Sequence, residues 1–178
     1  MSTVRLRIYL ARALTRASAE YNASHELFLR SIEDKHPEWE VLGFYGLGAS
    51  PTDGKVAEYD IIQVMKAHLV VAFTDVDSTG MGMESGIRFA LGLPILFVAQ
   101  AQWARTRMVT GPAELWPGHA LFDRYNHVDE VEGMIIEAVK HFGIDTAQDS
   151  PRSLTVAPHF QDLYRTHVLD MPVSHWKS

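Results

Sequence analysis

The segment Thr79–Gly92 (TGMGMESGIRFALG) combines a carboxylate with closely spaced glycines, a pattern suited to chemistry on a small molecule. It follows an apolar run at His68–Phe73. Because glycine lets the backbone turn tightly and come close to a ligand, Gly80 and Gly82 are candidate binding residues. Glu84 is expected in the first turn of the helix that follows, where the helix dipole favours a negative charge.

Two interpretations of Glu84 stay open at this point. A carboxylate at a glycine-rich helix start is well placed to bind or attack a ligand. It is also an ordinary residue for such a position, and Arg88, four residues on, is spaced to form an ion pair with it along the helix. The choice between a reactive and a structural carboxylate depends on the rest of the chain.

Apolar runs and amphipathic stretches alternate along the chain and predict its elements. The expected strands are Val4–Leu10, Glu38–Phe44, His68–Phe73, Pro94–Ala99 and Leu121–Tyr125. The expected helices are Ala13–Asp34, Val56–Ala67, the stretch after the glycines, and Val128–Phe142. We expect Gly43–Gly54 to be a loop and Gln100–Pro117 to be irregular.

Strands that alternate with helices predict a parallel sheet with helices on both faces. With right-handed crossovers this is a three-layer α/β sandwich of the flavodoxin/Rossmann-like class, with a five-stranded, mostly parallel sheet. We expect residues 1–143 to form this domain and residues 144–178 to form a C-terminal tail that packs on the domain or on a partner subunit. Ligands of such sheets bind beyond the carboxyl ends of the strands. The candidate segments are therefore Ala11–Arg16, Tyr45–Lys55, Thr74–Glu84 and Gln100–Arg107.

The composition argues against several classes of protein. The chain has 178 residues, a net charge of −6 and no cysteine. Disulfides, a thiolate nucleophile and a cysteine zinc site are therefore excluded, and nucleic-acid binding would need a basic footprint that the chain lacks. The first apolar segment is broken by Arg5, Arg7 and Arg12 and reads as a strand rather than a signal peptide. No window approaches the roughly 20 apolar residues of a membrane span, so we expect a soluble cytoplasmic protein.

Familiar cofactor and catalytic motifs fail at defined positions. Gly48–Val56 has one residue too many for a phosphate-binding P-loop, and Val56 stands where Ser or Thr would reach magnesium. In Gly80–Gly86 the third glycine is one position late for a dinucleotide fingerprint. No histidine pair has the HExxH spacing of a zinc site, and no GxSxG elbow marks a serine nucleophile. We therefore expect no metal and no cofactor.

Four pieces of the chain together resemble the nucleoside 2-deoxyribosyltransferase family, whose superfamily includes the 2′-deoxynucleoside 5′-monophosphate N-glycosidases. They are Arg7–Ala11 (RIYLA), Glu58–Asp60 (EYD), His68–Phe73 (HLVVAF) with its acidic turn, and Gly80–Gly86 (GMGMESG) with the helix after it. The last piece is similar to the family's nucleophile motif and is the only specific one. The resemblance extends in element order from the first expected strand to the fifth.

The resemblance implies a mechanism for this chain. Glu84 would attack the anomeric carbon of a 2′-deoxynucleoside and form a glycosyl ester, which a second base or water then resolves. Tyr9 would hydrogen-bond the Glu84 carboxylate, and Asp60 would hold the sugar hydroxyls. Asp75 and Asp77 are candidates for protonating the leaving base, and at most one of them would do so.

The chain departs from the family pattern at two places that decide the substrate. Six positions before the nucleophile the transferases have an acidic residue, whereas this chain has Ser78, which is more like the monophosphate glycosidases. Those enzymes have a Gly-Ser phosphate-binding turn after the first strand, and this chain has RALTR there. Arg12, Thr15 and Arg16 would still bind a phosphate near a helix start, which favours anions.

Three functions stay open, and each has a nucleoside or nucleotide as its small-molecule partner. The first is transfer of deoxyribose between bases, as in nucleotide salvage. The second is hydrolysis of a deoxynucleoside 5′-monophosphate, and the third is a catalytically inactive nucleotide-binding module. The resemblance also implies a homo-oligomer, a dimer or larger, in which Gln100–Pro117 and the tail would complete a neighbouring pocket.

Overall fold

The computed structural model describes residues 5–14, 16–42, 52–103, 106–146 and 166. The expected loop Gly43–Gly54 lies outside these residues up to position 51, and so do Thr15 and most of the tail 144–178. The division of the chain into a domain and a tail therefore stays a prediction.

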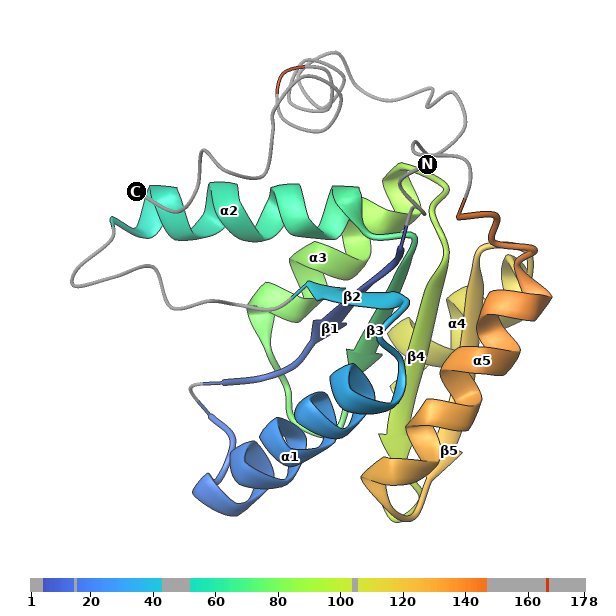
Figure 1. Ribbon diagram of the computed structural model, residues 1–178. Helices are drawn as coiled ribbons and strands as arrows, with labels where there is room; N and C mark the ends of the chain where they lie inside the picture. Colours follow the sequence, from blue (N-terminus) through green and yellow to red (C-terminus); the bar gives the residue numbers. More distant parts are fainter. Residues whose placement is uncertain (1–4, 15, 43–51, 104–105, 147–165, 167–178) are drawn as a thin grey trace.

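A five-stranded sheet forms the middle layer of the protein (Figure 1). Its strands are β1 (Leu6–Ala11), β2 (Trp39–Leu42), β3 (Leu69–Phe73), β4 (Ile95–Gln100) and β5 (Ala120–Tyr125). They lie in the order β2-β1-β3-β4-β5, and each neighbouring pair is parallel. β3 is buried along its whole length, as expected of a central parallel strand covered by helices on both faces. The predicted three-layer α/β sandwich is therefore confirmed.

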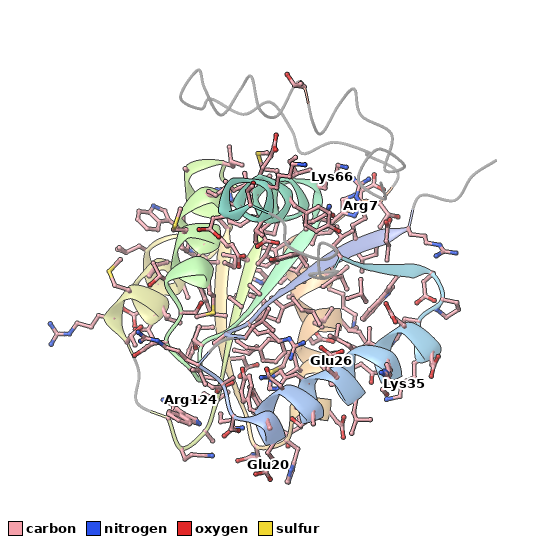
Figure 2. All side chains as sticks on the ribbon, turned by 90° about the vertical axis from the view of Figure 1, so that its left-hand side faces the viewer. Arg7, Glu20, Glu26, Lys35, Lys66 and Arg124 are labelled. Carbon is pink, nitrogen blue, oxygen red and sulfur yellow. The ribbon has the colours of Figure 1, made fainter. Side chains whose placement is uncertain are left out.

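Helices cover both faces of the sheet, and Figure 2 shows α1 and α2 on opposite sides of it. One face bears α1 (Ala19–Lys35), the short 3-10 helix η1 (Val128–Glu130) and α5 (Val131–His141); the other bears α2 (Asp53–Lys66), α3 (Thr79–Ala90) and α4 (Arg107–Leu115). None of the described helices is long and apolar enough to cross a lipid bilayer. Because side chains alternate along a strand, Ile8 of β1 packs with α1 and α5, whereas Tyr9 packs with α2 and α3. The alternation thus places Tyr9 on the face that bears the helix of Glu84.

α1 begins at Ala19 rather than at Ala13, so this boundary was predicted wrongly. The Ser18 hydroxyl accepts a hydrogen bond from the backbone N–H of Tyr21 at 3.1 Å and caps the helix. Apolar spacing does not reveal where such a cap will form. As a result, Arg12 and Arg16 lie in a connection between β1 and α1 rather than at a helix start.

α3 begins at Thr79, so the glycines expected in a loop lie inside the helix. The Ser78 hydroxyl accepts from the backbone N–H of Met81 at 3.4 Å and caps α3. Neither Gly80 nor Gly82 has a positive φ. Glu84 accordingly lies in the second turn rather than the first, and a tight turn is not the reason for either glycine.

One further helix boundary and one whole helix differ from the prediction. α2 begins at Asp53 rather than Val56, because Thr52 caps it. The stretch predicted to be irregular contains α4, which includes Gly111 and Pro112, two residues that disfavour a helix. Val109 and Ala113 pack against the core, and this contact stabilises a helix that local propensity opposes.

The strand order places a change of direction between β1 and β3. From β1 the chain moves outward to β2 and then returns past β1 to β3. In open parallel sheets the crevice at the carboxyl ends of two such strands is the usual ligand site. Tyr9 lies in β1, paired with Val70 of β3, so it is carried by one of the two strands at which this crevice opens.

Candidate active site

Tyr9 and Glu84 form a hydrogen bond that joins β1 to α3. The Tyr9 hydroxyl donates to Oε1 of Glu84 at 2.9 Å. Tyr9 is only 4% exposed, and Glu84 is partly buried. A phenol held in the core has little freedom to turn, so this bond fixes the orientation of the carboxylate that it contacts.

Asp60 of α2 acts on the same carboxylate through its charge. Burial raises the pKa of Asp60 to about 6, and its Oδ1 is buried with no hydrogen-bond partner among the described residues. Burial first, and then the charge of Asp60, raise the pKa of Glu84 to about 7, although the hydrogen bond from Tyr9 opposes the rise. Burial and the nearby Glu84 carboxylate raise the pKa of Tyr9, so its hydroxyl keeps its proton.

The surroundings of these two carboxylates favour a positively charged ligand. Within the described part of the chain, no lysine, arginine or histidine forms an ion pair with Glu84 or Asp60. Partly buried anions without a cation are poorly stabilised. A ligand on which positive charge develops would supply the missing counter-charge.

The expected ion pair between Glu84 and Arg88 does not form. Every hydrogen bond of the Arg88 guanidinium goes to a backbone carbonyl, and Arg88 is fully buried. The structural interpretation of Glu84 as half of an ion pair with Arg88 is therefore wrong.

A cavity of about 790 Å³ lies between α3 and α4, on a different side of α3 from Glu84. The predicted binding residues that line it are Arg16, Asp77, Ser78, Gly80 and Gly82. Glu84, Tyr9 and Asp60 do not line it. The predicted site residues thus form two groups, each partly carried by α3: Glu84 with Tyr9 and Asp60, and the residues that line the cavity.

Asp75 and Arg12 belong to neither group, because other residues occupy their polar atoms. Asp75 is 4% exposed; one oxygen accepts from the backbone N–H of Gln100 at 2.5 Å, and the other accepts from the hydroxyls of Tyr21 and Tyr125. Arg12 is bound to Glu26 on α1, which Figure 2 shows on the opposite side of the sheet from α2.

The sequence did not reveal the apolar side chains that line the cavity or the role of Arg88. Phe89, Phe97 and Trp116 line the cavity, and the Phe89 and Phe97 rings stack at 5.8 Å between centroids. The signal that could have found Phe89 is helical spacing, because Gly82, Gly86 and Phe89 lie on one face of α3. No local signal identifies Phe97 or Trp116, which come from other elements.

The described residues contain no group of three or more His, Asp or Glu side chains placed to hold a metal ion.

Comparison with known proteins shows a shared fold. No protein-family model matches the chain, and no curated protein sequence matches it. In structure it is similar to the CMP N-glycosidase BcmB of Clostridium botulinum, with a TM-score of 0.55 and 17% identity, over 74% of this chain and 98% of that one. It is also similar to a conserved protein from Enterococcus faecalis V583, with a TM-score of 0.45 and 17% identity, over 79% of this chain and 88% of that one. The second likeness is too weak to support an inference.

Glu84→Gln is expected to stabilise the protein at pH 8 and to change its stability little at pH 5. Since the folded-state pKa of Glu84 is raised to about 7, the stability that its protonated form contributes is complete below the unfolded-state pKa and is lost as the pH rises through about 7. Glutamine cannot ionise, so the gain at pH 8 should be on the order of 1–3 kcal/mol. Thermal unfolding at both pH values measures it, with exposed Glu33→Gln as the control. A loss of stability in Glu84→Gln at pH 8 would contradict this account of the site.

Asp75→Asn is expected to lower the free energy of unfolding by about 1–3 kcal/mol. The asparagine amide nitrogen cannot accept a hydrogen bond, so at least one donor among Gln100, Tyr21 and Tyr125 loses its acceptor. Urea denaturation compares this variant with Asp77→Asn, whose side chain is exposed. Equal stability of the two variants would refute a structural role for Asp75.

Proposed function

We propose that this protein is an N-glycosidase-type enzyme that cleaves the bond between the base and the sugar of a nucleoside 5′-monophosphate, with Glu84 as the nucleophile. The observation that carries the proposal is the Glu84 carboxylate, aimed by the Tyr9 hydroxyl at 2.9 Å and unpaired with any cation among the described residues. The resemblance of Gly80–Gly86 to a nucleophile motif and the fold shared with a CMP N-glycosidase both support it.

In the proposed first step an oxygen of Glu84 bonds to the anomeric carbon while the bond from that carbon to the base breaks. The base leaves with the bonding electrons and takes up a proton, and a glycosyl ester remains on Glu84. The transition state has oxocarbenium character. Two poorly solvated carboxylates stabilise such a positive charge, which gives Asp60 an electrostatic role in addition to binding the sugar hydroxyls.

In the second step water attacks the anomeric carbon, loses a proton, and releases the sugar phosphate and the Glu84 carboxylate. The proton gained by the base in the first step balances the one lost by water in the second. Asp77, which is exposed and lines the cavity, is the proposed donor to the base. Asp75 is not proposed for this role, because its two oxygens accept hydrogen bonds from three other groups.

The start of α3 is the proposed phosphate site. Ser78, Gly80 and Arg16 line the same cavity. Ser78 caps α3, whose first N–H groups favour an anion, and Arg16 is exposed and would supply a positive charge. Arg12 is bound to Glu26 and is not proposed as a phosphate ligand.

The glycines of α3 support a ligand at this helix. Glycine in a helix interior costs about 1 kcal/mol relative to alanine, and α3 contains Gly80, Gly82 and Gly86. A Cβ at Gly82 or Gly86 would meet nothing within 4 Å, so packing within the described chain does not require glycine there. Room for a substrate against the helix would account for them.

A second copy of the chain is proposed to cover α3 and α4. Four large apolar side chains on these helices and at the end of α4 are exposed: Met83, Met108, Leu115 and Trp116. Exposed large apolar side chains are candidate contacts for a partner, and a neighbouring subunit on these two helices would lie beside the cavity, which Met108 and Trp116 line.

The direct test is incubation of the purified chain with CMP, dCMP and the corresponding nucleosides, with and without adenine as an acceptor base. If the enzyme is a hydrolase, a monophosphate incubated without adenine should give equal amounts of free base and sugar phosphate. Since Glu84 must be ionised, kcat/KM should fall about tenfold per pH unit below about 7, and Glu84→Gln should lower kcat about 10³-fold or more. Glu33→Gln should match the wild type.

Other outcomes of that test select other functions. Formation of an adenine nucleotide from a monophosphate, or of an adenine nucleoside from a nucleoside, with base release only when adenine is present, would replace hydrolysis by transfer of the sugar. Binding of CMP or dCMP without turnover in the wild type would identify a nucleotide-binding module that has lost the chemistry.

Gly82→Ala is expected to stabilise the protein by about 1 kcal/mol and yet to weaken substrate binding about tenfold or more. The new methyl group meets no atom of the described chain, but it would enter the space proposed for the ligand. Gly133→Ala on α5 is the matched control, because it also meets nothing within 4 Å and lies on the opposite face of the sheet. Thermal unfolding and KM are measured for both, and an unchanged KM in Gly82→Ala would place the substrate elsewhere.

A further inference from the structure

We infer that Arg88 is a positioning residue, which fixes α3 against the carboxyl-terminal end of α2 and thereby holds Glu84 and Asp60 in one site. The inference rests on the proposed function for its catalytic consequence. Its structural part concerns only the relative placement of two helices.

The Arg88 guanidinium binds the backbone of three neighbouring segments. Nη1 donates to the carbonyl of Val64 in α2 at 3.1 Å and to that of Ala67, the C-cap of α2, at 2.9 Å. Nη2 donates to the carbonyl of His68 at 3.1 Å and to that of Pro94 at 2.6 Å, and Nε donates to Pro94 at 3.1 Å. One side chain thus joins α3 to the end of α2 and to the starts of β3 and β4.

Burial of the charged Arg88 side chain costs free energy. A fully buried guanidinium loses its hydration, and this burial lowers its pKa to about 9, so it remains protonated at neutral pH. Among the described residues no carboxylate pairs with it. Its counter-charge is the ring of carbonyls, two of which lie at the negative end of the α2 dipole and have lost their helical partners.

The two carboxylates and the arginine act on the same pair of helices. Glu84 and Arg88 are four residues apart and lie on one face of α3. Asp60 lies on α2, seven residues before Ala67. Repulsion between Glu84 and Asp60 acts to separate α3 from α2, while the hydrogen bonds of Arg88 hold the helices together one turn further along α3.

A lysine at position 88 cannot make the same set of hydrogen bonds. Its ammonium has three donors on a flexible stem, whereas the planar guanidinium has five donors in a fixed fork that reaches four carbonyls. Arg88→Lys keeps the positive charge but loses the set of hydrogen bonds to the four carbonyls. It therefore tests whether α3 is placed by these hydrogen bonds or whether a cation at this position is enough.

The experiment follows the titration of Glu84 in the full chain by ¹³C NMR of labelled glutamate carboxyls, with the Glu84 signal assigned by its loss in Glu84→Gln. The groups that act on Glu84 are Tyr9 of β1 and Asp60 of α2, with Tyr59 acting on Tyr9. When α3 shifts away from α2, Glu84 gains water and lies farther from Asp60. In Arg88→Lys it should therefore titrate about one pH unit lower than in the wild type, and kcat should fall about 10- to 100-fold with KM within about threefold.

The control for lost stability is Ile135→Ala, which removes buried apolar volume on the opposite face of the sheet. It should lower the melting temperature and leave both the Glu84 titration and kcat unchanged below that temperature. A folded Arg88→Lys protein with the wild-type titration and kcat would overturn the inference.

If Arg88→Lys does not fold, hydrogen exchange in the wild type tests the same contact. The Nη1–H groups of Arg88, labelled with ¹⁵N, donate to Val64 and Ala67 and should exchange as slowly as the backbone N–H of Ala67 at the end of α2. Fast exchange of the Nη1–H groups while Ala67 stays protected would refute the contact between Arg88 and α2.

The proposed function and the positioning role of Arg88 can fail separately, and the two failures give different results. If the wild type releases no base but Arg88→Lys lowers the pH at which Glu84 titrates, the positioning role stands and the enzymatic proposal fails. If the wild type turns over and Arg88→Lys changes neither quantity, the enzymatic proposal stands and the positioning role fails.

Discussion

The hydrogen bond from Tyr9 to Glu84 is the contact on which the proposed site depends. It joins a central strand to a helix that begins 70 residues later in the chain. It needs β1 beside β3, Tyr9 on the face that packs with α2 and α3, and α3 placed so that its second turn lies over β1. A small shift of any of these elements would leave an exposed carboxylate with its ordinary solvation and no fixed direction.

α3 has two faces with different properties. One face bears Glu84 and Arg88, directed at α2 and the start of the neighbouring strands. Another bears Gly82, Gly86 and Phe89, which line the cavity toward α4. The glycines weaken the helix by their conformational freedom, whereas the Arg88 hydrogen bonds and the Ser78 cap stabilise its two ends. The helix is thus stabilised at its two ends, and its glycine-bearing face lines the cavity.

The buried charged side chains of this protein are of two kinds, those whose polar atoms have hydrogen-bond partners and those whose charge is poorly compensated. Asp75 and Arg88 have hydrogen-bond partners for their buried polar atoms and so stabilise the junctions between elements. Glu84 and Asp60 are poorly compensated, and burial raises the pKa of both. An uncompensated pair of this kind lowers stability and is typical of functional sites, which distinguishes these two carboxylates from Asp75.

The sequence by itself determined the strands, the parallel α/β architecture and the helix after β3, because long apolar runs and helical periods are strong local signals. The resemblance of short motifs also anticipated the contact between Tyr9 and Glu84. Helix starts were predicted less well: the caps Ser18, Thr52 and Ser78 compete with helix propensity over one or two residues, and α4 forms against the propensity of Gly111 and Pro112 because it packs on the core.

Only the tertiary structure decided which acidic and basic side chains are available. Asp75 and Asp77 are two residues apart, yet one is enclosed by Tyr21, Tyr125 and Gln100 while the other lines a cavity. Glu84 and Arg88 have the spacing of an ion pair, yet the arginine turns to the carbonyls of α2 and β4. Sequence spacing specifies which face of an element a residue occupies, but the partner that a buried charge finds depends on segments far away in the chain, and these meet only in the folded protein.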